Sequence, residues 1–532
     1  MASSAEAGIP EPRNPQSEGE EPLWPGFVLR MVLPGTIGTI LIALGAFGVG
    51  WLPVDTSVAE LPVIDALRGT PIGEAVSKFA VVAGILIMIQ AWLFIGYDVM
   101  KGRIQDVRRL WLVLAAWCAP LLLTPPLFSR DVYSYFTQGR LWIAGFNPYQ
   151  EGTASIPGWF NDGGDPMWSE SKTPYGQFFL LLERGVVAFS GPHAYTGAIV
   201  FRIIALIGVA LLAWAVVRLA TWCGIEPSKA VWMAALNPLV ILHFVSGAHN
   251  DALMVGLVAA GLVLAVERYA WAGVILVTLA GAVKPIGLLA LPFVGLIWAG
   301  TRSNWSRRFA MWIATGAIAI VILGLFGWLT GTGFGWINAL STPGAVRTWL
   351  SPPTAVGMNV GNVGEIFGLS ITDQAINYAR LAGTVLTVLI LAWLCLKPEG
   401  RTPIRGAALG FFWLVALGPI VQPWYLLWSL PLFAASGLPR WQFRVASIGT
   451  VLLTIYSGVG SGGMQENYGS LSDTTLFIIA LAFLIAMLWV SKREWALLFG
   501  KVSAAGLVPV SDADKARAQQ ATMRKPGEAV AG

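Results

Sequence analysis

The apolar segment Leu110–Phe128, LWLVLAAWCAPLLLTPPLF, is followed directly by Ser129–Tyr135, SRDVYSY. A segment of this kind has roughly the 20 residues needed to cross a ~30 Å hydrocarbon core. The second segment therefore places Asp131 at the mouth of a membrane span. Because an ionised carboxylate is costly to dehydrate, this position predicts either an anchor at the water–lipid boundary or part of an active site.

The composition of the whole chain supports the membrane interpretation. Hydrophobic residues make up 56% of it and charged residues 12%, whereas soluble domains have about a quarter charged residues. Apolar runs recur along nearly the entire sequence, without the ten-residue alternation that is typical of an outer-membrane barrel. The sequence predicts an all-α polytopic membrane protein.

We expect about 13–14 transmembrane helices from the number of apolar runs. The first run has no short apolar core ending in a small-residue cleavage site, so it is expected to be a retained span. The interval 270–300 could be two short spans or one long bent helix. The approximate expected ranges are 30–52, 78–98, 109–128, 194–218, 229–246, 250–267, 270–283, 286–300, 307–330, 374–396, 404–420, 424–437, 443–460 and 473–491.

Alternate connections between these spans are rich in Lys and Arg, which predicts that they are cytoplasmic. Both termini are then cytoplasmic. The expected division is a disordered tail at 1–28, a membrane domain at 29–495 and a second tail, again disordered, at 496–532. The basic residues lie in short loops, so the net charge of +5 does not predict a nucleic-acid partner.

The opposite, extracytoplasmic loops contain most of the unusual polar residues, which favours an enzyme or a transporter with an outward-facing site. The longest of them, 129–193, has two amphipathic segments at 131–145 and 178–189 that are too short to span. We expect interfacial helices there. The three cysteines lie in or beside apolar segments and form neither a disulfide framework nor a zinc spacing.

Each polar motif has a structural interpretation beside a functional one. Asp131 could cap the helix that follows, because Asp is a favoured N-cap worth roughly 0.5–2 kcal/mol, and a cap can also be a base. The His249-Asn250-Asp251 cluster could likewise be a cap. Lys284 stands before Pro285 inside an apolar stretch, where a lysine snorkels, pairs or meets an anion.

Arg202 and Arg380 lie within about two turns of the outer ends of spans. Snorkelling explains either one alone, whereas several cations on one face suit a phosphate. Five tryptophans map to outer loops, where anchoring at the interface is favoured over stacking against a sugar. These tryptophans are Trp159, Trp168, Trp336, Trp349 and Trp424.

The motifs SRDVYSYFTQGRL, FNPY, TPYGQ, ALNPLVILHFVSGAHNDALM and AVKPIGLLALPFVGLIW together resemble a known family. It is that of the actinobacterial polyprenyl-phosphomannose-dependent α-1,6-mannopyranosyltransferases, which extend the mannan backbone of lipomannan and lipoarabinomannan. The resemblance covers roughly residues 28–495. It is nearest to the members that build the proximal backbone, with the distal-backbone members as the near alternative.

The resemblance implies the glycosyltransferase C fold, a plasma-membrane location and an active site on the extracytoplasmic face. It implies a polyprenyl-phosphate-mannose donor and a phosphatidylinositol-mannoside or lipomannan acceptor. A catalytic acid in an early outer loop transfers to Asp131. Many superfamily members have two adjacent acids there and this chain has one, so no metal ligands and no cofactor are assigned.

The remaining site assignments follow from this implied reaction. The residues expected to bind the donor phosphate are Lys284, Arg202, Arg380 and Lys172. The residues expected to bind sugar or shape the site are His249, Asn250, Asp251, Tyr135, Tyr175, Gln422 and Trp424. Two alternatives stay open at this point, namely transfer of another lipid-phosphate sugar, and transport of a lipid-linked sugar.

Overall fold

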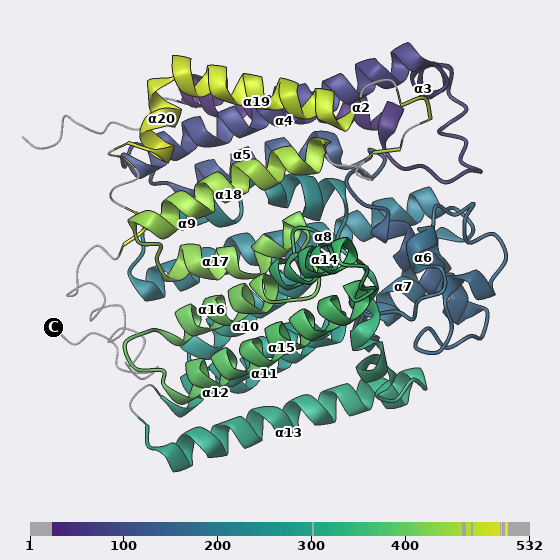
Figure 1. Cartoon of the computed structure of the whole chain (residues 1–532). Helices are drawn as coiled ribbons and strands as arrows, with labels where there is room; N and C mark the ends of the chain where they lie inside the picture. Colours follow the sequence, from purple (N-terminus) through teal and green to yellow (C-terminus); the bar gives the residue numbers. More distant parts are fainter. Residues whose placement is uncertain are drawn as a thin grey trace, which may run out of the picture.

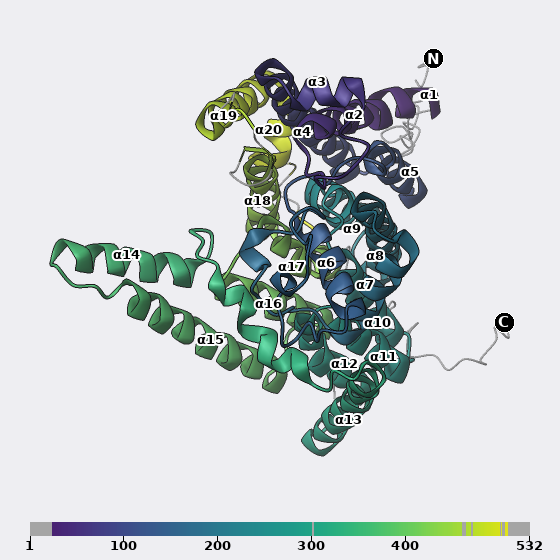
Figure 2. The same ribbon diagram turned by 90° about the vertical axis from the view of Figure 1, so that its right-hand side faces the viewer.

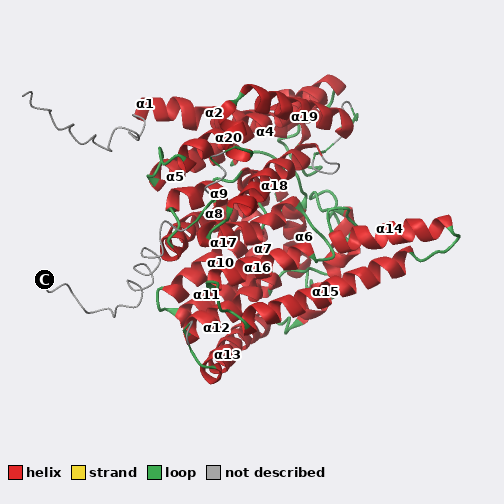
Figure 3. Ribbon diagram, turned by 60° about the vertical axis from the view of Figure 1, so that its left-hand side comes forward, coloured by secondary structure: helices red, strands yellow, loops and turns green. Residues whose placement is uncertain are grey.

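The structure is a computed structural model that describes residues 24–300, 303–459, 464–465, 467–469, 472–500, 502 and 506–508. Within these residues the chain is helical throughout (Figures 1 and 3), and its one extended pairing is an isolated bridge between Leu438 and Leu507. The all-α prediction is confirmed for this part of the chain. Most of the two tails predicted to be disordered lies outside it.

The N-terminal helices are α1 (Trp24–Phe27), η2 (Val28–Val32), α2 (Leu33–Val49), α3 (Pro62–Arg68), α4 (Pro71–Met100), α5 (Val107–Cys118) and η3 (Ala119–Leu121). The segment around the long loop forms α6 (Asp131–Ile143), η4 (Thr153–Ser155), η5 (Pro166–Trp168) and α7 (Gln177–Ser190). Helices begin at Trp24 and end at Leu498, so both ends of the helical part reach slightly into the predicted tails.

The central helices are α8 (Ala194–Cys223), α9 (Pro227–Ala234), η6 (Val240–Ser246), α10 (Asp251–Val266), α11 (Ala270–Val283), η7 (Pro285–Ala290), α12 (Leu291–Ala299) and α13 (Trp305–Thr330). The C-terminal helices are η8 (Gly335–Ala345), α14 (Pro352–Ile366), α15 (Thr372–Leu396), α16 (Pro403–Ala416), η9 (Pro423–Tyr425), α17 (Leu426–Ser436), α18 (Arg440–Val459), α19 (Asp473–Val490) and α20 (Lys492–Leu498).

Six helical segments of the described chain are by themselves long and apolar enough to cross a membrane, and a seventh if the bent pair η6 and α10 is one span. This is fewer than the 13–14 spans expected. Several expected spans are broken or shortened, because Pro and Gly interrupt them; Lys284, in extended conformation before Pro285, divides the interval 270–300 into α11 and η7–α12. The six are Trp24–Val49, Pro71–Met100, Ala194–Cys223, Trp305–Thr330, Thr372–Leu396 and Asp473–Val490.

Glycines allow the long helices to approach closely. A Cβ on Gly84 of α4 would lie 2.4 Å from the carbonyl oxygen of Gly38 of α2, and one on Gly256 of α10 would lie 2.4 Å from that of Gly208 of α8. Small residues at such crossings are typical of helix packing in membranes, where close backbone contact replaces the hydrophobic effect. These two crossings fix the frame on which the functional groups are held.

The segment predicted as interfacial helices lies at one end of the bundle. α6 and α7 pack against each other there and α8 lies beside them (Figures 1 and 2). The two predicted helices are present, but α6 is buried over almost its whole length rather than along one face. It therefore belongs to the packed core at this end of the bundle.

Two further features complete the architecture. α14 and α15 form a hairpin that projects from the body (Figures 2 and 3). The C-terminal helices α18, α19 and α20 return to pack against α4, near the start of the chain. In the first turn of α4, Glu74 Oε2 accepts hydrogen bonds of 2.8 Å from the backbone N–H groups of Asn467 and Tyr468.

Candidate active site

The polar residues of the central helices are brought together by a break between η6 and α10. The two helices are bent by 112° at this break, and Ala248 has a φ of 53°, a left-handed conformation that is uncommon outside glycine. The turn places His249 and Asn250 next to the start of α6, and α10 begins at Asp251. A straight helix could not present these three side chains to a neighbouring element at one level.

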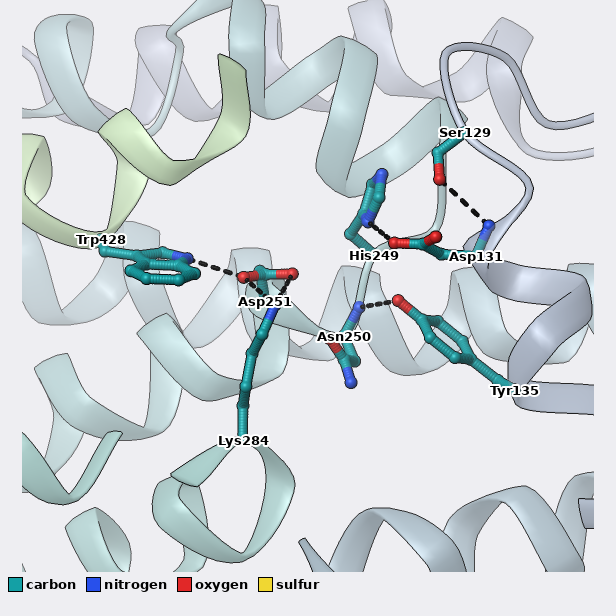
Figure 4. A network of polar contacts seen from close by, with 8 residues as sticks. All are labelled: Ser129, Asp131, Tyr135, His249, Asn250, Asp251, Lys284 and Trp428. Atoms are coloured by element: carbon teal, nitrogen blue, oxygen red, sulfur yellow. Dashed lines mark hydrogen bonds and ion pairs between the residues drawn. The ribbon is translucent and has the colours of Figure 1, made fainter. Parts of the chain in front are cut away.

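Asp131 occupies the first turn of α6 and does not cap it. The N-cap is Arg130, with no capping bond from its side chain, and the backbone N–H of Asp131 donates to Ser129 Oγ at 3.0 Å. The carboxylate instead points toward His249, whose Nδ1 lies 3.4 Å from Oδ2 (Figure 4). This geometry leaves the carboxylate available for chemistry, because its side chain is still 21% exposed.

The surroundings of this carboxyl change its acidity. The helix that carries it, α6, is not among the candidate membrane spans. Burial raises the pKa of Asp131 to about 6, and the positive charge of Lys284 and the hydrogen bond with Ser129 oppose that rise. A carboxyl with a pKa near neutrality can accept a proton more effectively than an ordinary one.

His249 is fully buried and stacks on Trp424, with 4.1 Å between ring centroids. Trp424 also lies against His243, at 5.0 Å, and His243 Nε2 is 2.8 Å from Ser457 Oγ. Within the described residues His249 Nδ1 has no hydrogen-bond partner beyond its 3.4 Å approach to Asp131 Oδ2, and His249 Nε2 and the indole N–H of Trp424 have none. Buried polar atoms rarely stay unpaired, so these groups are suited to bind a polar ligand.

Asn250 is a further buried residue with unpaired polar side-chain atoms. It is 2% exposed, and neither its amide nitrogen nor its amide oxygen has a partner among the described residues. Its backbone N–H points to the Tyr135 hydroxyl at 3.5 Å. The Tyr135 ring packs edge-on against Tyr175 and Phe179, with centroid distances of 5.1 and 5.0 Å.

Asp251 and Lys284 form a buried ion pair at the other end of this row. Lys284 Nζ donates to both carboxylate oxygens, at 2.8 and 2.9 Å, and Trp428 Nε1 donates to Oδ1 at 2.6 Å. The ammonium also lies 5.3 Å from the ring centroid of Tyr425. Lys284 is 16% exposed while Asp251 is 1% exposed, so the cation is the member of the pair that a ligand can reach.

Arg202, on α8, holds the backbone of this site. It is 1% exposed, and its guanidinium donates to the carbonyls of Val245, Ser246 and Leu122 at 2.8–2.9 Å. Val245 and Ser246 end η6 just before the turn with His249, and Leu122 lies in the segment that leads to Asp131. Its assignment to a phosphate stays a prediction, but these contacts give it the geometry of a clamp between the two segments.

We therefore expect Arg202→Lys to lower kcat while leaving KM for the donor within about twofold, because lysine lacks the planar fork that reaches three carbonyls. Steady-state kinetics with varied donor concentration make this measurement. A large rise in donor KM with unchanged kcat would instead support the phosphate assignment.

The row of polar residues does not include three other predicted site residues, which are Arg380, Lys172 and Gln422. The guanidinium of Arg380 donates to Thr354 Oγ1 and to the carbonyls of Gly344 and Val346, at 2.6–2.9 Å. Lys172 is exposed, and its carbonyl accepts from Thr342 at 3.1 Å. Gln422 is half-buried and precedes η9, which carries Trp424.

Sequence reasoning did not single out Trp428, Tyr425 or His243. Trp428 and Tyr425 surround the Asp251–Lys284 pair, and His243 stacks on Trp424. The signal available was the spacing of Trp424 and Trp428, which places the two indoles on the same helical face one turn apart. Among the described residues, no cluster of three His, Cys, Asp or Glu side chains could hold a metal ion.

The arrangement places a carboxylate of raised pKa and an accessible cation at opposite ends of a row of unpaired polar groups (Figure 4). Such a row can bind a polyhydroxylated molecule, take a proton from it at one end and stabilise an anion at the other. The fold and the site thus define a multi-pass membrane protein of the group-transferring enzyme class.

Comparisons with known proteins identify the family. Residues 31–300 match the family described as "Alpha-(1->6)-mannopyranosyltransferase, N-terminal domain", and residues 353–491 match "MptB C-terminal domain". The chain therefore belongs to the α-(1→6)-mannopyranosyltransferase family, and it is an α-(1→6)-mannopyranosyltransferase. This identification decides against the transporter alternative.

The relatives are similar over most of their length. A probable α-(1→6)-mannopyranosyltransferase of Mycolicibacterium smegmatis is 32% identical over 88% of this chain and 89% of its own. An α-(1→6)-mannopyranosyltransferase of Mycobacterium tuberculosis is 32% identical over 88% of both chains, and α-(1→6)-mannopyranosyltransferase A of that organism is 34% identical over 81% and 85%. No solved structure gives a significant match, so the glycosyltransferase C fold stays a prediction.

Proposed function

We propose that this mannosyltransferase moves mannose from a polyprenyl-phosphate donor to the 6-hydroxyl of a mannan acceptor, with inversion at the anomeric carbon. The observation that carries the proposal is that unpaired polar groups of His249 and Asn250 lie between Asp131 and Lys284 (Figure 4). The unpaired indole N–H of Trp424 belongs to a ring that stacks on His249. A sugar bound in this row would have a base on one side and a cation on the other.

Asp131 acts as the general base. A sugar hydroxyl is a poor nucleophile at neutral pH until its proton is removed. The carboxylate takes that proton while the hydroxyl oxygen forms a bond with the anomeric carbon of a β-linked mannosyl phosphate, and the product is α-linked. His249, 3.4 Å from the carboxylate, orients it toward the acceptor.

Lys284 stabilises the leaving group. The bond between the anomeric carbon and the phosphate oxygen breaks, and the electron pair leaves with the polyprenyl phosphate. The developing charge on that oxygen needs a fixed positive group in a partly dry site. Asp251 and Trp428 hold the ammonium in place, and its remaining N–H is free to turn to the phosphate.

The proposed location of this reaction is the extracytoplasmic side of the plasma membrane. The support is the charge of the loops. The loop 129–193 and the other loops on its side of the spans are poorer in Lys and Arg than the loops at the opposite ends of the spans. The proposed acceptor is a phosphatidylinositol-mannoside or lipomannan. Both substrates would then be lipid-borne and would reach the site from the bilayer.

The test is direct transfer by the purified full-length protein in lipid nanodiscs. Polyprenyl-phosphomannose and a short α-1,6-mannoside are supplied, and the product linkage is determined by methylation analysis. We expect a new α-1,6-linked mannose. Transfer from another lipid-phosphate sugar, with none from polyprenyl-phosphomannose, would keep the enzyme class and overturn the donor.

The pH dependence of this transfer follows from the raised pKa of Asp131. A general base must be ionised, so kcat/KM should rise with pH through a midpoint of about 6 and become constant above it. The measurement is kcat/KM for the acceptor between pH 4.5 and about 8 in one constant-ionic-strength buffer series. A midpoint near 4, the ordinary value of an aspartic acid, would contradict the buried base.

A further inference from the structure

An apolar groove lies beside α2, α3 and α4, and no residue of the polar row lines it. Its volume is about 680 Å³, within the range of ordinary small-molecule sites. Side chains such as Leu41, Phe47 and Ile64 line it, and Leu123, Tyr195 and Ile199 contribute to the lining from two further segments. The lining is aliphatic and aromatic, which suits a hydrocarbon chain and excludes a sugar or a phosphate.

Part of the groove lining is continuous along the chain with the segment that carries Asp131. Leu123 lies in the segment between η3 and α6, which leads directly to Asp131. The Tyr195 hydroxyl donates to the carbonyl of Leu123, and Arg202 donates to that of the preceding Leu122. These contacts join the groove lining to the segment that leads to Asp131, so the groove lies on the Asp131 side of the site.

The opposite end of the site lies away from the groove. In both Figure 1 and Figure 2, α2, α3 and α4 lie on one side of α6, and α11 and α12, which flank Lys284, lie on the other. Figure 4 shows Asp131 and Lys284 at the two ends of the row, with Asn250 between them. The groove and the phosphate-binding cation are thus on opposite sides of the reacting centre.

We propose that this groove holds the hydrocarbon anchor of the lipid acceptor, an inference that rests on the proposed function. In an inverting displacement the attacking hydroxyl and the leaving phosphate lie on opposite faces of the anomeric carbon. The donor's prenyl chain is attached to that phosphate and leaves the site at the Lys284 end. The chain that enters at the Asp131 end, beside the groove, belongs to the acceptor.

The experiment fills the groove and compares two acceptors with one head group. Ala80→Trp puts an indole into the groove from α4, and Leu123→Trp does so from its exposed position between η3 and α6. Ala314→Trp, at a half-buried position on the span α13 outside the groove, is the matched control. The acceptors are a hexadecyl and a methyl glycoside of the same α-1,6-dimannoside, in mixed micelles of fixed composition.

Wild-type enzyme is expected to have a lower KM for the hexadecyl acceptor than for the methyl acceptor. Either groove variant should raise KM for the hexadecyl acceptor at least about tenfold, the effect of excluding roughly two methylene groups. KM for the methyl acceptor and for the donor should stay unchanged, as should all three constants in Ala314→Trp.

Two results would overturn the proposal. A rise in donor KM that depends on the length of the prenyl chain would assign the groove to the donor, and unchanged constants in both groove variants would assign it to bulk membrane lipid. Failure of the proposed function has a different signature, since wild-type enzyme would then transfer mannose to neither acceptor.

Discussion

Asp131→Asn is expected to lower kcat by about 10²–10⁴-fold, the usual contribution of a positioned general base. The amide has nearly the same shape and leaves in place the backbone hydrogen bond to Ser129 Oγ and the contact with His249, but it cannot accept the proton of the acceptor hydroxyl. Donor binding should change little, because Lys284, the proposed phosphate-binding group, lies at the other end of the site. The measurement is initial transfer rates at saturating donor and acceptor.

The matched comparison is Asp165→Asn. Asp165 is close enough to Asp131 to affect its pKa, and its own carboxylate accepts from the backbone N–H of Met167 at 2.9 Å. This variant should keep most of the wild-type rate. Near-normal transfer by Asp131→Asn, with a large loss in Asp165→Asn, would move the base to the neighbouring acid.

Lys284→Met is the second substitution with a large expected effect. Removal of one preorganised group that stabilises developing charge typically lowers kcat by about 10²–10³-fold. It should also destabilise the protein by about 3–5 kcal/mol, because Asp251 would stay buried without its partner. Transfer rates and thermal unfolding in the same detergent measure the two effects separately.

A double variant separates the catalytic role from the structural one. Lys284→Met combined with Asp251→Asn removes both charges of the pair, so most of the lost stability should return while transfer stays low. Trp428 can still donate to the amide oxygen in place of the carboxylate. Recovery of transfer together with stability would show that the pair is structural, and would remove Lys284 from the proposed mechanism.

Much of the site could be predicted because polar residues are conspicuous in apolar sequence. Asp131, the His249-Asn250-Asp251 cluster and Lys284 all stand out in this way, and the structure brings them into one row. Their partners could not be predicted in the same manner. The approach of His249 to Asp131 depends on the 112° bend between η6 and α10, which no periodicity encodes.

Two other features show where sequence reasoning stops. Arg202 was assigned to a phosphate because several cations on one membrane face suit an anion. The structure shows that its guanidinium also binds backbone carbonyls at the end of η6, and sequence does not show free carbonyls. The described helices that are long enough to span by themselves are fewer than the apolar runs for a related reason. A short apolar run can be a span or a buried helix, and hydropathy alone does not distinguish the two.

The contact between α4 and the end of the chain has a consequence for how the protein is made. Glu74 receives its two backbone hydrogen bonds from Asn467 and Tyr468, and α18, α19 and α20 cover α4. During synthesis the ribosome releases these residues hundreds of positions after α4 has left the exit tunnel. The hairpin of α2 and α4 therefore lies in the bilayer without its contacts to α18, α19 and α20 until translation is nearly complete. The enzyme is then completed only after its first helices have inserted into the membrane. Premature termination anywhere before residue 467 yields a chain that lacks the contact with α4.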